Sequence, residues 1–183
     1  DVYKRQAHNP GKTIDDFSFE NAFSFEFWIN IEAIVPQTVF GLPRKEGEYV
    51  SAFRQEAKGW WVDSYINNGG WVKATSRDVS NYGEWHHYAT TFDGTEVKVY
   101  IDGKQTVATK AKGPLNKTGA LFRLSNSCCN GRFFVGAIDE MRVSNATRSQ
   151  KEIQTLMNLG IEGFLSVDSE QKLTTIWSRI KQD

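Results

Sequence analysis

The sequence predicts an all-β fold, a two-sheet antiparallel sandwich with a short helical segment near the C-terminus. Three observations indicate this fold. Residues 17–31 (FSFENAFSFEFWINI) alternate between large apolar and mostly polar side chains, residues 84–104 (EWHHYATTFDGTEVKVYIDGK) hold two Asp-Gly pairs, and aromatic residues make up 13% of the chain in short segments bounded by Gly, Asn and Asp. Since 183 residues can bury a sizeable core, one domain suffices.

The first predicted strand lies within residues 17–31. Successive side chains of a strand point to opposite faces, so period-2 alternation gives the strand one apolar face. That face carries Phe23, Phe25, Phe27 and Ile29, and the other carries Ser24, Glu26, Trp28 and Asn30.

Residues 84–104 predict consecutive strands joined by tight turns. Asp93-Gly94 and Asp102-Gly103 suit the positive φ angles of hairpin turns. Residues 97–101 alternate as a half-buried strand, whereas residues 85–92 have bulky side chains on both faces, which indicates a central strand covered on two sides. Further strands are predicted at residues 38–42, 49–54, 60–66, 71–75, 120–124 and 133–143.

Helical spacing replaces alternation after the last strand. Ser149 and Glu152 form a capping box, and apolar residues then follow at helical spacing up to Gly160. We expect residues 1–11 to be a non-native leader and tail, residues 12–160 to be the sandwich, and residues 161–183 to be an extension. A second amphipathic helix is predicted there from Leu173, Ile176, Trp177 and Ile180.

Charge and apolar runs argue against several classes of partner. The chain has 22 Lys and Arg against 22 Asp and Glu with no basic stripe, which argues against nucleic acid. No apolar run approaches the roughly 20 residues that a membrane span needs, so membrane insertion is not expected. Cys128 and Cys129 are adjacent, which disfavours a disulfide between them and leaves their redox state open.

Three segments in this order carry a family resemblance: FSFEFWIN, EWHHYATTFDGTEVKVYIDGK and FVGAIDEMRVSNATRSQKEI. Together they resemble the LamG-like jelly-roll domain of the concanavalin A-like lectin and glucanase superfamily over about residues 17–159. The resemblance implies a jelly-roll sandwich from a larger secreted or cell-surface protein, with a bacterial source expected. Family members usually begin with one more strand, so the first strand is expected to be missing here.

The IDE motif raises Asp139 as a candidate site residue. Strand parity places Asp139 with Ala137, Met141 and Val143 unless a bulge intervenes, and a buried carboxylate needs a partner. Two alternatives stay open: a structural acid held by backbone N–H groups or by Arg142, and a metal ligand. The resemblance implies that Asp139 helps to hold a structural Ca²⁺, with further oxygens expected from Asn126, Asn130, Asp15 and Asp16.

His86 and His87 are expected to be structural, because adjacent strand residues point to opposite faces and cannot easily chelate one metal ion.

The ligand-binding candidates are aromatic and polar residues in the segment around NNGG. They are Trp61, Asp63, Tyr65, Trp71 and Tyr82. Exposed aromatic rings can stack on sugars while polar groups bind hydroxyls, although core packing is the alternative that aromatic residues favour in a sandwich. Trp61, Asp63 and Tyr65 would share one side of their strand.

The sequence predicts a non-catalytic module. Retaining glycosidases need two carboxyl groups about 5 to 5.5 Å apart, and no strand offers them on alternate residues. The predicted function is therefore binding or adhesion, with a glycan or an extracellular protein as partner. A purely structural spacer is the alternative, and a glycoside hydrolase is a weaker one. The oligomeric state stays open.

Overall fold

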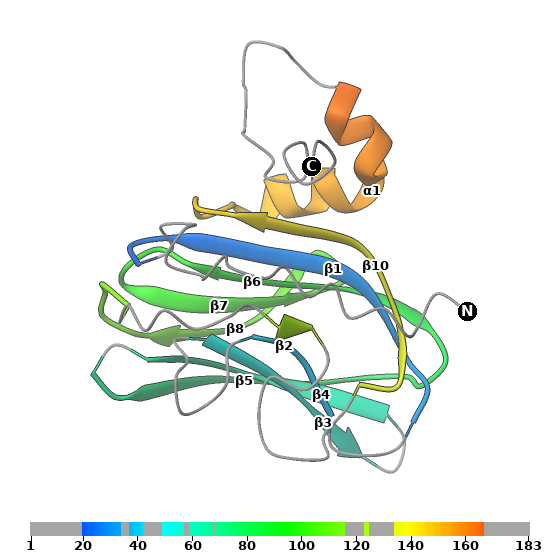
Figure 1. The fold of residues 1–183 in the computed structure, drawn as a ribbon, viewed down its shortest axis with the longest axis horizontal. Coiled ribbons are helices and arrows are strands. Elements are labelled where there is room, and N and C mark those ends of the chain that lie inside the picture. The colour runs from blue at the N-terminus through cyan, green and yellow to red at the C-terminus, as the bar shows by residue number, and fades with distance from the viewer. Residues whose placement is uncertain are drawn as a thin grey trace.

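Two antiparallel sheets face each other in the structure, a computed structural model that describes residues 20–33, 37–41, 49–56, 59–67, 69–115, 123–124 and 134–166 (Figure 1). The first sheet has the order β10-β1-β6-β7-β8 and the second β5-β4-β3-β2-β9. The strands are β1 Phe23–Ile31, β2 Gln37–Gly41, β3 Tyr49–Glu56, β4 Gly59–Asn67, β5 Trp71–Ser80, β6 Trp85–Phe92, β7 Glu96–Ile101, β8 Lys104–Lys110, β9 Arg123–Leu124 and β10 Gly136–Ser144. The helix α1 spans Gln150–Ser166.

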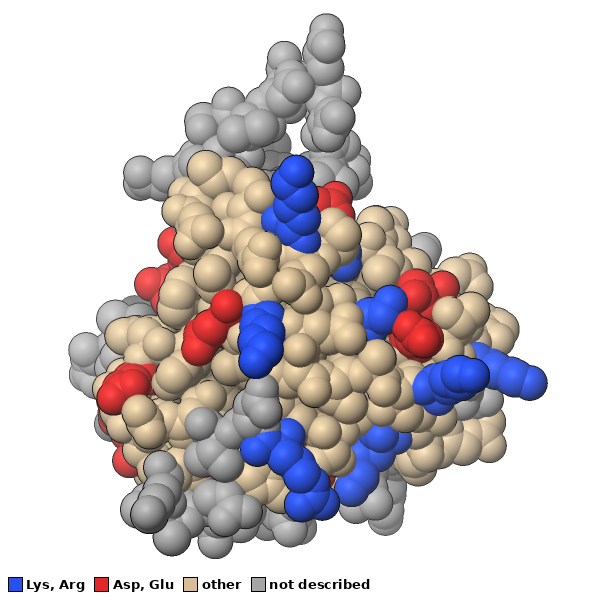
Figure 2. Space-filling view, turned by 180° about the vertical axis from the view of Figure 1, so that it is seen from behind, with Lys and Arg blue, Asp and Glu red and all other residues tan. Residues whose placement is uncertain are grey.

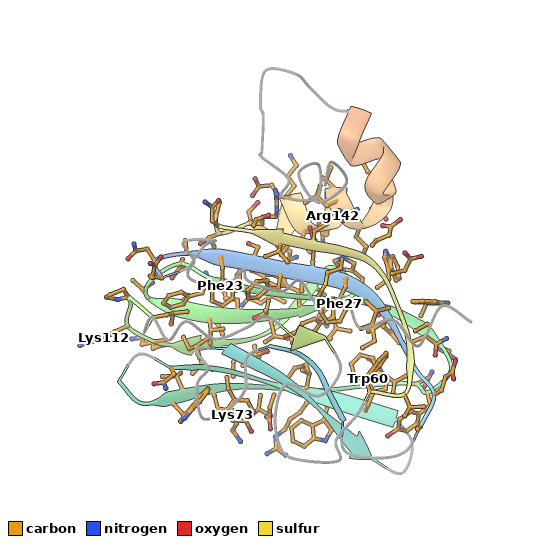
Figure 3. The ribbon with its side chains drawn as sticks, viewed as in Figure 1. Phe23, Phe27, Trp60, Lys73, Lys112 and Arg142 are labelled. Atoms are coloured by element: carbon orange, nitrogen blue, oxygen red, sulfur yellow. The ribbon has the colours of Figure 1, made fainter. Side chains whose placement is uncertain are left out.

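The core lies between the sheets, where the alternating apolar faces of the strands meet. The apolar face of β1 is buried completely, and from the second sheet Trp60, Val62 and Ile66 of β4 pack against it (Figure 3). Ser64 and Tyr88 share a hydrogen bond across the two sheets, with 2.8 Å between their oxygens. The predicted sandwich and the apolar face of β1 are therefore confirmed.

The two Asp-Gly turns differ. Asp102 and Gly103 have φ angles of 50° and 71°, the pair of positive values that a two-residue hairpin turn needs, and they join β7 to β8. At the other turn only Gly94 has a positive φ, and Asp93 acts through its carboxylate, which accepts hydrogen bonds from the backbone N–H groups of Thr95 and Glu96. Both turns are confirmed, by different chemistry.

The helix α1 covers the outer face of the first sheet (Figure 1). Its capping box is present, since Ser149 N–H donates to Glu152 and Glu152 N–H donates back to Ser149 Oγ. Ile153 packs with Ala89 and Tyr100, which gives β6 the second cover that its bulky faces predicted. The helix continues to Ser166, past the predicted end at Gly160. The second predicted helix lies outside the described residues.

β8 and β5 depart most from the prediction. The sequence predicted no strand for β8, because Lys104–Lys110 lies at a sheet edge and has largely exposed side chains. β5 continues to Ser80, five residues past its predicted end at Thr75. A register shift opposite Trp60 and Val62 interrupts the alternation in that part of β5, so the pattern alone could not show its length.

Candidate functional site

An aromatic and charged surface lies on the outer face of β4 and β5, and we call it the outer platform. Its residues are Trp61, Asp63 and Tyr65 from β4 and Trp71, Lys73, Thr75 and Arg77 from β5. Because Val62 and Ile66 point into the core, their neighbours in β4 point outward. The register places Asp63 opposite Thr75 and Tyr65 opposite Lys73, so the two rows face each other. The predicted shared side of Trp61, Asp63 and Tyr65 is confirmed.

Asp63 lies at the centre of the outer platform and is only 1% exposed. Its Oδ1 accepts a hydrogen bond from the Thr75 hydroxyl at 2.6 Å, and its Oδ2 accepts one from the Tyr65 hydroxyl at 2.9 Å. The Lys73 ammonium is 3.9 Å from Oδ1. A buried carboxylate needs such donors, and here they hold Asp63 in place and fix the phenol of Tyr65 above it.

Aromatic rings flank Asp63 along the platform. Trp71 is 38% exposed and meets the Tyr65 ring edge to face, with the centroids 6.3 Å apart. On the other side the Arg77 guanidinium carbon lies 5.7 Å from the centroid of the Trp61 ring, in a cation–π arrangement. The platform thus offers ring surfaces at both ends and oriented hydroxyl groups between them.

Two aromatic residues of the same segment lie elsewhere. Tyr82 is partly buried against the core cluster, so the structure does not bring this ligand-binding candidate to the platform. Trp60 is 1% exposed in the core, and its indole N–H donates to the Asn81 carbonyl. The core-packing alternative therefore holds for Tyr82 and Trp60.

A second polar cluster is buried on the outer face of the first sheet, on the side where α1 lies (Figure 3). Glu26 is 2% exposed, and its carboxylate lies 3.6 Å from Arg142 Nη1 and 3.6 Å from His87 Nε2. Arg142 also donates to Glu140 at 3.3 Å. The Arg148 backbone N–H donates to Ser24 Oγ, which ties this end of β1 to the entry of α1.

Burial governs the protonation of this cluster. Desolvation raises the pKa of Glu26, against the opposing attraction of Arg142 and Arg148. Desolvation and the nearby Arg142 charge lower the pKa of His87 to about 4, so its imidazole is neutral at pH 7. We interpret the cluster as a structural ion pair that joins β1 to β10, because Glu26, His87 and Arg142 are all enclosed.

Asp139 does not point among apolar neighbours, because the bulge that the sequence analysis left open is present in β10. The register between β1 and β10 shifts between Glu26 and Trp28, so β10 carries an extra residue there, and Glu140 has a φ of 49°. This bulge leaves Asp139 exposed, with Oδ1 accepting from the Glu140 N–H. Arg142 was expected as one partner of Asp139, but in the structure its guanidinium pairs with Glu26.

The other metal candidates, Asn126, Asn130, Asp15 and Asp16, lie outside the described residues, as do Cys128 and Cys129. Within the described ranges, no group of three or more His, Cys, Asp or Glu side chains could hold a metal ion. A calcium site at Asp139 would thus depend on oxygens from those four residues, and it stays a prediction. His86 and His87 do point apart, since His86 contacts Trp60 and Asp102 whereas His87 contacts Trp28 and Glu26.

The polar residues that β5 adds to the platform were not predicted from the sequence, and neither was the buried Glu26 of the first sheet. Lys73, Thr75 and Arg77 follow Trp71 at alternate positions, which is the signal that could have placed them on one face with it. Glu26 could have been suspected because it shares its strand face with Trp28, and a large aromatic side chain on that face indicates a cover.

A family model described as the concanavalin A-like lectin/glucanases superfamily matches residues 7–154. No curated protein sequence matches the chain. In the described part of the chain, no helix has the length and apolar character to cross a membrane.

Several solved structures share this fold at low sequence identity. Domain 4 of AbnA, an extracellular arabinanase from Geobacillus stearothermophilus solved with arabinotriose, is 22% identical with a TM-score of 0.60, over 74% of this chain and 66% of that one. A putative carbohydrate-binding protein from Bacteroides ovatus is 18% identical with a TM-score of 0.64, over 85% and 44%. A pentraxin from Limulus polyphemus is 13% identical with a TM-score of 0.60, over 74% and 69%. The chain spans less than two thirds of the first two structures.

Proposed function

The chain belongs to the concanavalin A-like lectin and glucanase superfamily, and from this premise we propose that it is a non-catalytic module that binds carbohydrate on the outer platform. The observation that carries the proposal is the row of rings around an oriented carboxylate: Trp61, Tyr65 and Trp71 beside the buried Asp63. Sugar rings present apolar faces and hydroxyl edges, which suit aromatic side chains and polar groups respectively.

The fixed geometry of the platform favours binding over a packing role. Tyr65 and Thr75 are both held by Asp63, so little conformational entropy is lost when a ligand contacts them. Trp71 keeps more than a third of its surface exposed. Two of the similar structures are a putative carbohydrate-binding protein and a complex with arabinotriose, which supports a glycan as the ligand class.

The described side chains of the platform do not include the pair of acids that glycoside hydrolysis needs. Among the described side chains of β4 and β5, Asp63 is the one carboxylate, and its oxygens accept from Thr75 and Tyr65. Glycosidases of both stereochemical types use two carboxyl groups that flank the scissile bond. We therefore propose recognition without catalysis, in an extracellular or cell-surface protein, with adhesion as the role of the whole protein.

Replacement of Trp71 by Ala is expected to weaken glycan binding while the fold is retained. Loss of one stacking ring should cost about 1 kcal/mol, or roughly fivefold in Kd. The measurement is calorimetric titration with the best oligosaccharide from a glycan array. The matched control is Trp85→Ala, which removes a 47% exposed tryptophan from the other sheet and should leave Kd unchanged. Equal losses in both variants, or no binder on the array, would favour the structural spacer.

Calcium is the second part of the proposal, as a stabiliser of the loops through Asp139. A ligand present at a hundred times its Kd adds about 2.7 kcal/mol to the free energy of unfolding. Thermal scans with and without Ca²⁺ should then show a higher Tm in the wild type and no change in Asp139→Ala. A Tm that does not respond to Ca²⁺ in either protein would reject the calcium site.

A further inference from the structure

The outer platform carries one positive charge that no acid among its described side chains balances. The charges there are Asp63, Lys73 and Arg77, and the Lys73 ammonium lies 3.9 Å from the Asp63 carboxylate. Arg77 is exposed, and no ion pair between described residues includes it. Figure 2 shows Lys and Arg side chains across the face seen there, some of them at its lower end, on the side where the sheet of β4 and β5 lies in Figure 1.

The position of Arg77 over Trp61 prepares its guanidinium for an anion. The guanidinium carbon lies 5.7 Å from the ring centroid, within the range of a cation–π attraction, and the N–H donors in the plane of the group can still meet an anion. Two parallel N–H donors match the two oxygens of a carboxylate. The cation–π contact with Trp61 also favours one position of the long Arg77 side chain before any ligand arrives, which lowers the entropy lost on binding.

The length of the platform indicates an oligosaccharide. Trp61 and Tyr65 are four residues apart on one strand, which corresponds to roughly 13 Å. This distance exceeds the length of a single sugar ring. We therefore expect two sugars of one oligosaccharide, the first on Tyr65 and Trp71 and the second beside Trp61 and Arg77. A sugar seated at the Trp61 end would present its substituents to Arg77.

We propose that the outer platform selects acidic glycans, in which a sugar at the Trp61 end carries a carboxylate that pairs with Arg77. This inference rests on the proposed function and names its ligand class, glycans that contain uronic acid. A sulfate group offers similar acceptor oxygens, so the experiment includes sulfated and carboxylated probes.

The test compares tetragalacturonate with its methyl ester, which has the same rings without the charge. Tetragalacturonate should bind the wild type roughly five- to tenfold more tightly, the effect of one charge-assisted, partly solvated pair. The difference should shrink as salt rises. Arg77→Gln should remove the preference, because it should lower the affinity for tetragalacturonate more than the affinity for the ester, whereas Arg77→Lys should restore part of the preference. Lys151→Gln, with the same charge change on α1, should keep the full preference.

The outcomes separate the two proposals. Equal affinity for the acid and the ester, or an unchanged preference in Arg77→Gln, overturns acidic selection and leaves glycan binding intact. Failure of both probes and of the glycan array overturns both proposals. Dextran sulfate bound in preference to dextran and to tetragalacturonate would overturn the assignment to carboxylates in favour of sulfates.

Discussion

Arg142→Met should destabilise the fold by about 3–5 kcal/mol, the cost of removing one partner from a buried ion pair. Arg142 is 4% exposed and faces the 2% exposed Glu26, so the variant leaves Glu26 enclosed with its nearest guanidinium gone. For a domain of this size the Tm should fall by roughly 10 °C. Urea unfolding at pH 7 provides the free energy of unfolding directly.

A double variant separates the lost pair from lost packing. Glu26→Gln combined with Arg142→Met removes both charges, and we expect it to be more stable than Arg142→Met alone, because no uncompensated charge stays buried. Lys98→Met is the control, since Lys98 pairs with Glu96 and Asp93 but is 27% exposed and should cost no more than about 1 kcal/mol. Similar losses in Arg142→Met and Lys98→Met would contradict the structural role assigned to the cluster.

Acidification should weaken the fold through His87. Its pKa is about 4 in the folded protein and 6.5 for an unperturbed imidazole, so between these values the unfolded chain binds a proton that the folded protein does not. The stability that neutral His87 contributes is complete above pH 6.5 and is lost as pH falls to about 4, a total of about 3 kcal/mol. Acidification has the opposite effect on the contribution of Glu26 to stability. Burial raises the pKa of Glu26, so the folded protein holds that proton more tightly than the unfolded chain does.

His87→Gln isolates this contribution. Urea unfolding at pH 7, 5.5 and 4.5 should show a smaller loss of stability in the variant than in the wild type, because Gln does not titrate. The comparison leaves Glu26 in place in both proteins. Parallel pH profiles for the two proteins would show that His87 is not held neutral by the fold.

Much of the fold follows from local pattern. β6 begins and ends at the residues that alternation and the Asp-Gly turns predicted, and β4 extends only one residue beyond its prediction at each end. These strands have one apolar face that must be buried, so period 2 identifies them. β8 lacks such a face, because it lies at an edge, and it was not predicted.

The sites depend on contacts that no local pattern encodes. The burial of Asp63 becomes visible only when β5 pairs with β4 and brings Thr75 opposite it. Likewise Arg142 meets Glu26 only because β10 pairs with β1, and the bulge in that pairing turns Asp139 outward. Register and bulges arise from the assembled sheet, so the sequence could name candidate residue types and could not pair them.

The most direct test of glycan binding on the outer platform is a two-dimensional NMR titration of the indole N–H signals. The chain has six tryptophans: Trp28, Trp60, Trp61, Trp71, Trp85 and Trp177. Four of them probe the two sheets, since Trp61 and Trp71 belong to the outer platform whereas Trp28 and Trp85 belong to the first sheet. On addition of tetragalacturonate, or of the best binder from the array, we predict that the largest shifts occur at Trp61 and Trp71. Shifts at Trp28 and Trp85, with Trp61 and Trp71 unchanged, would place the ligand on the other sheet and contradict the account.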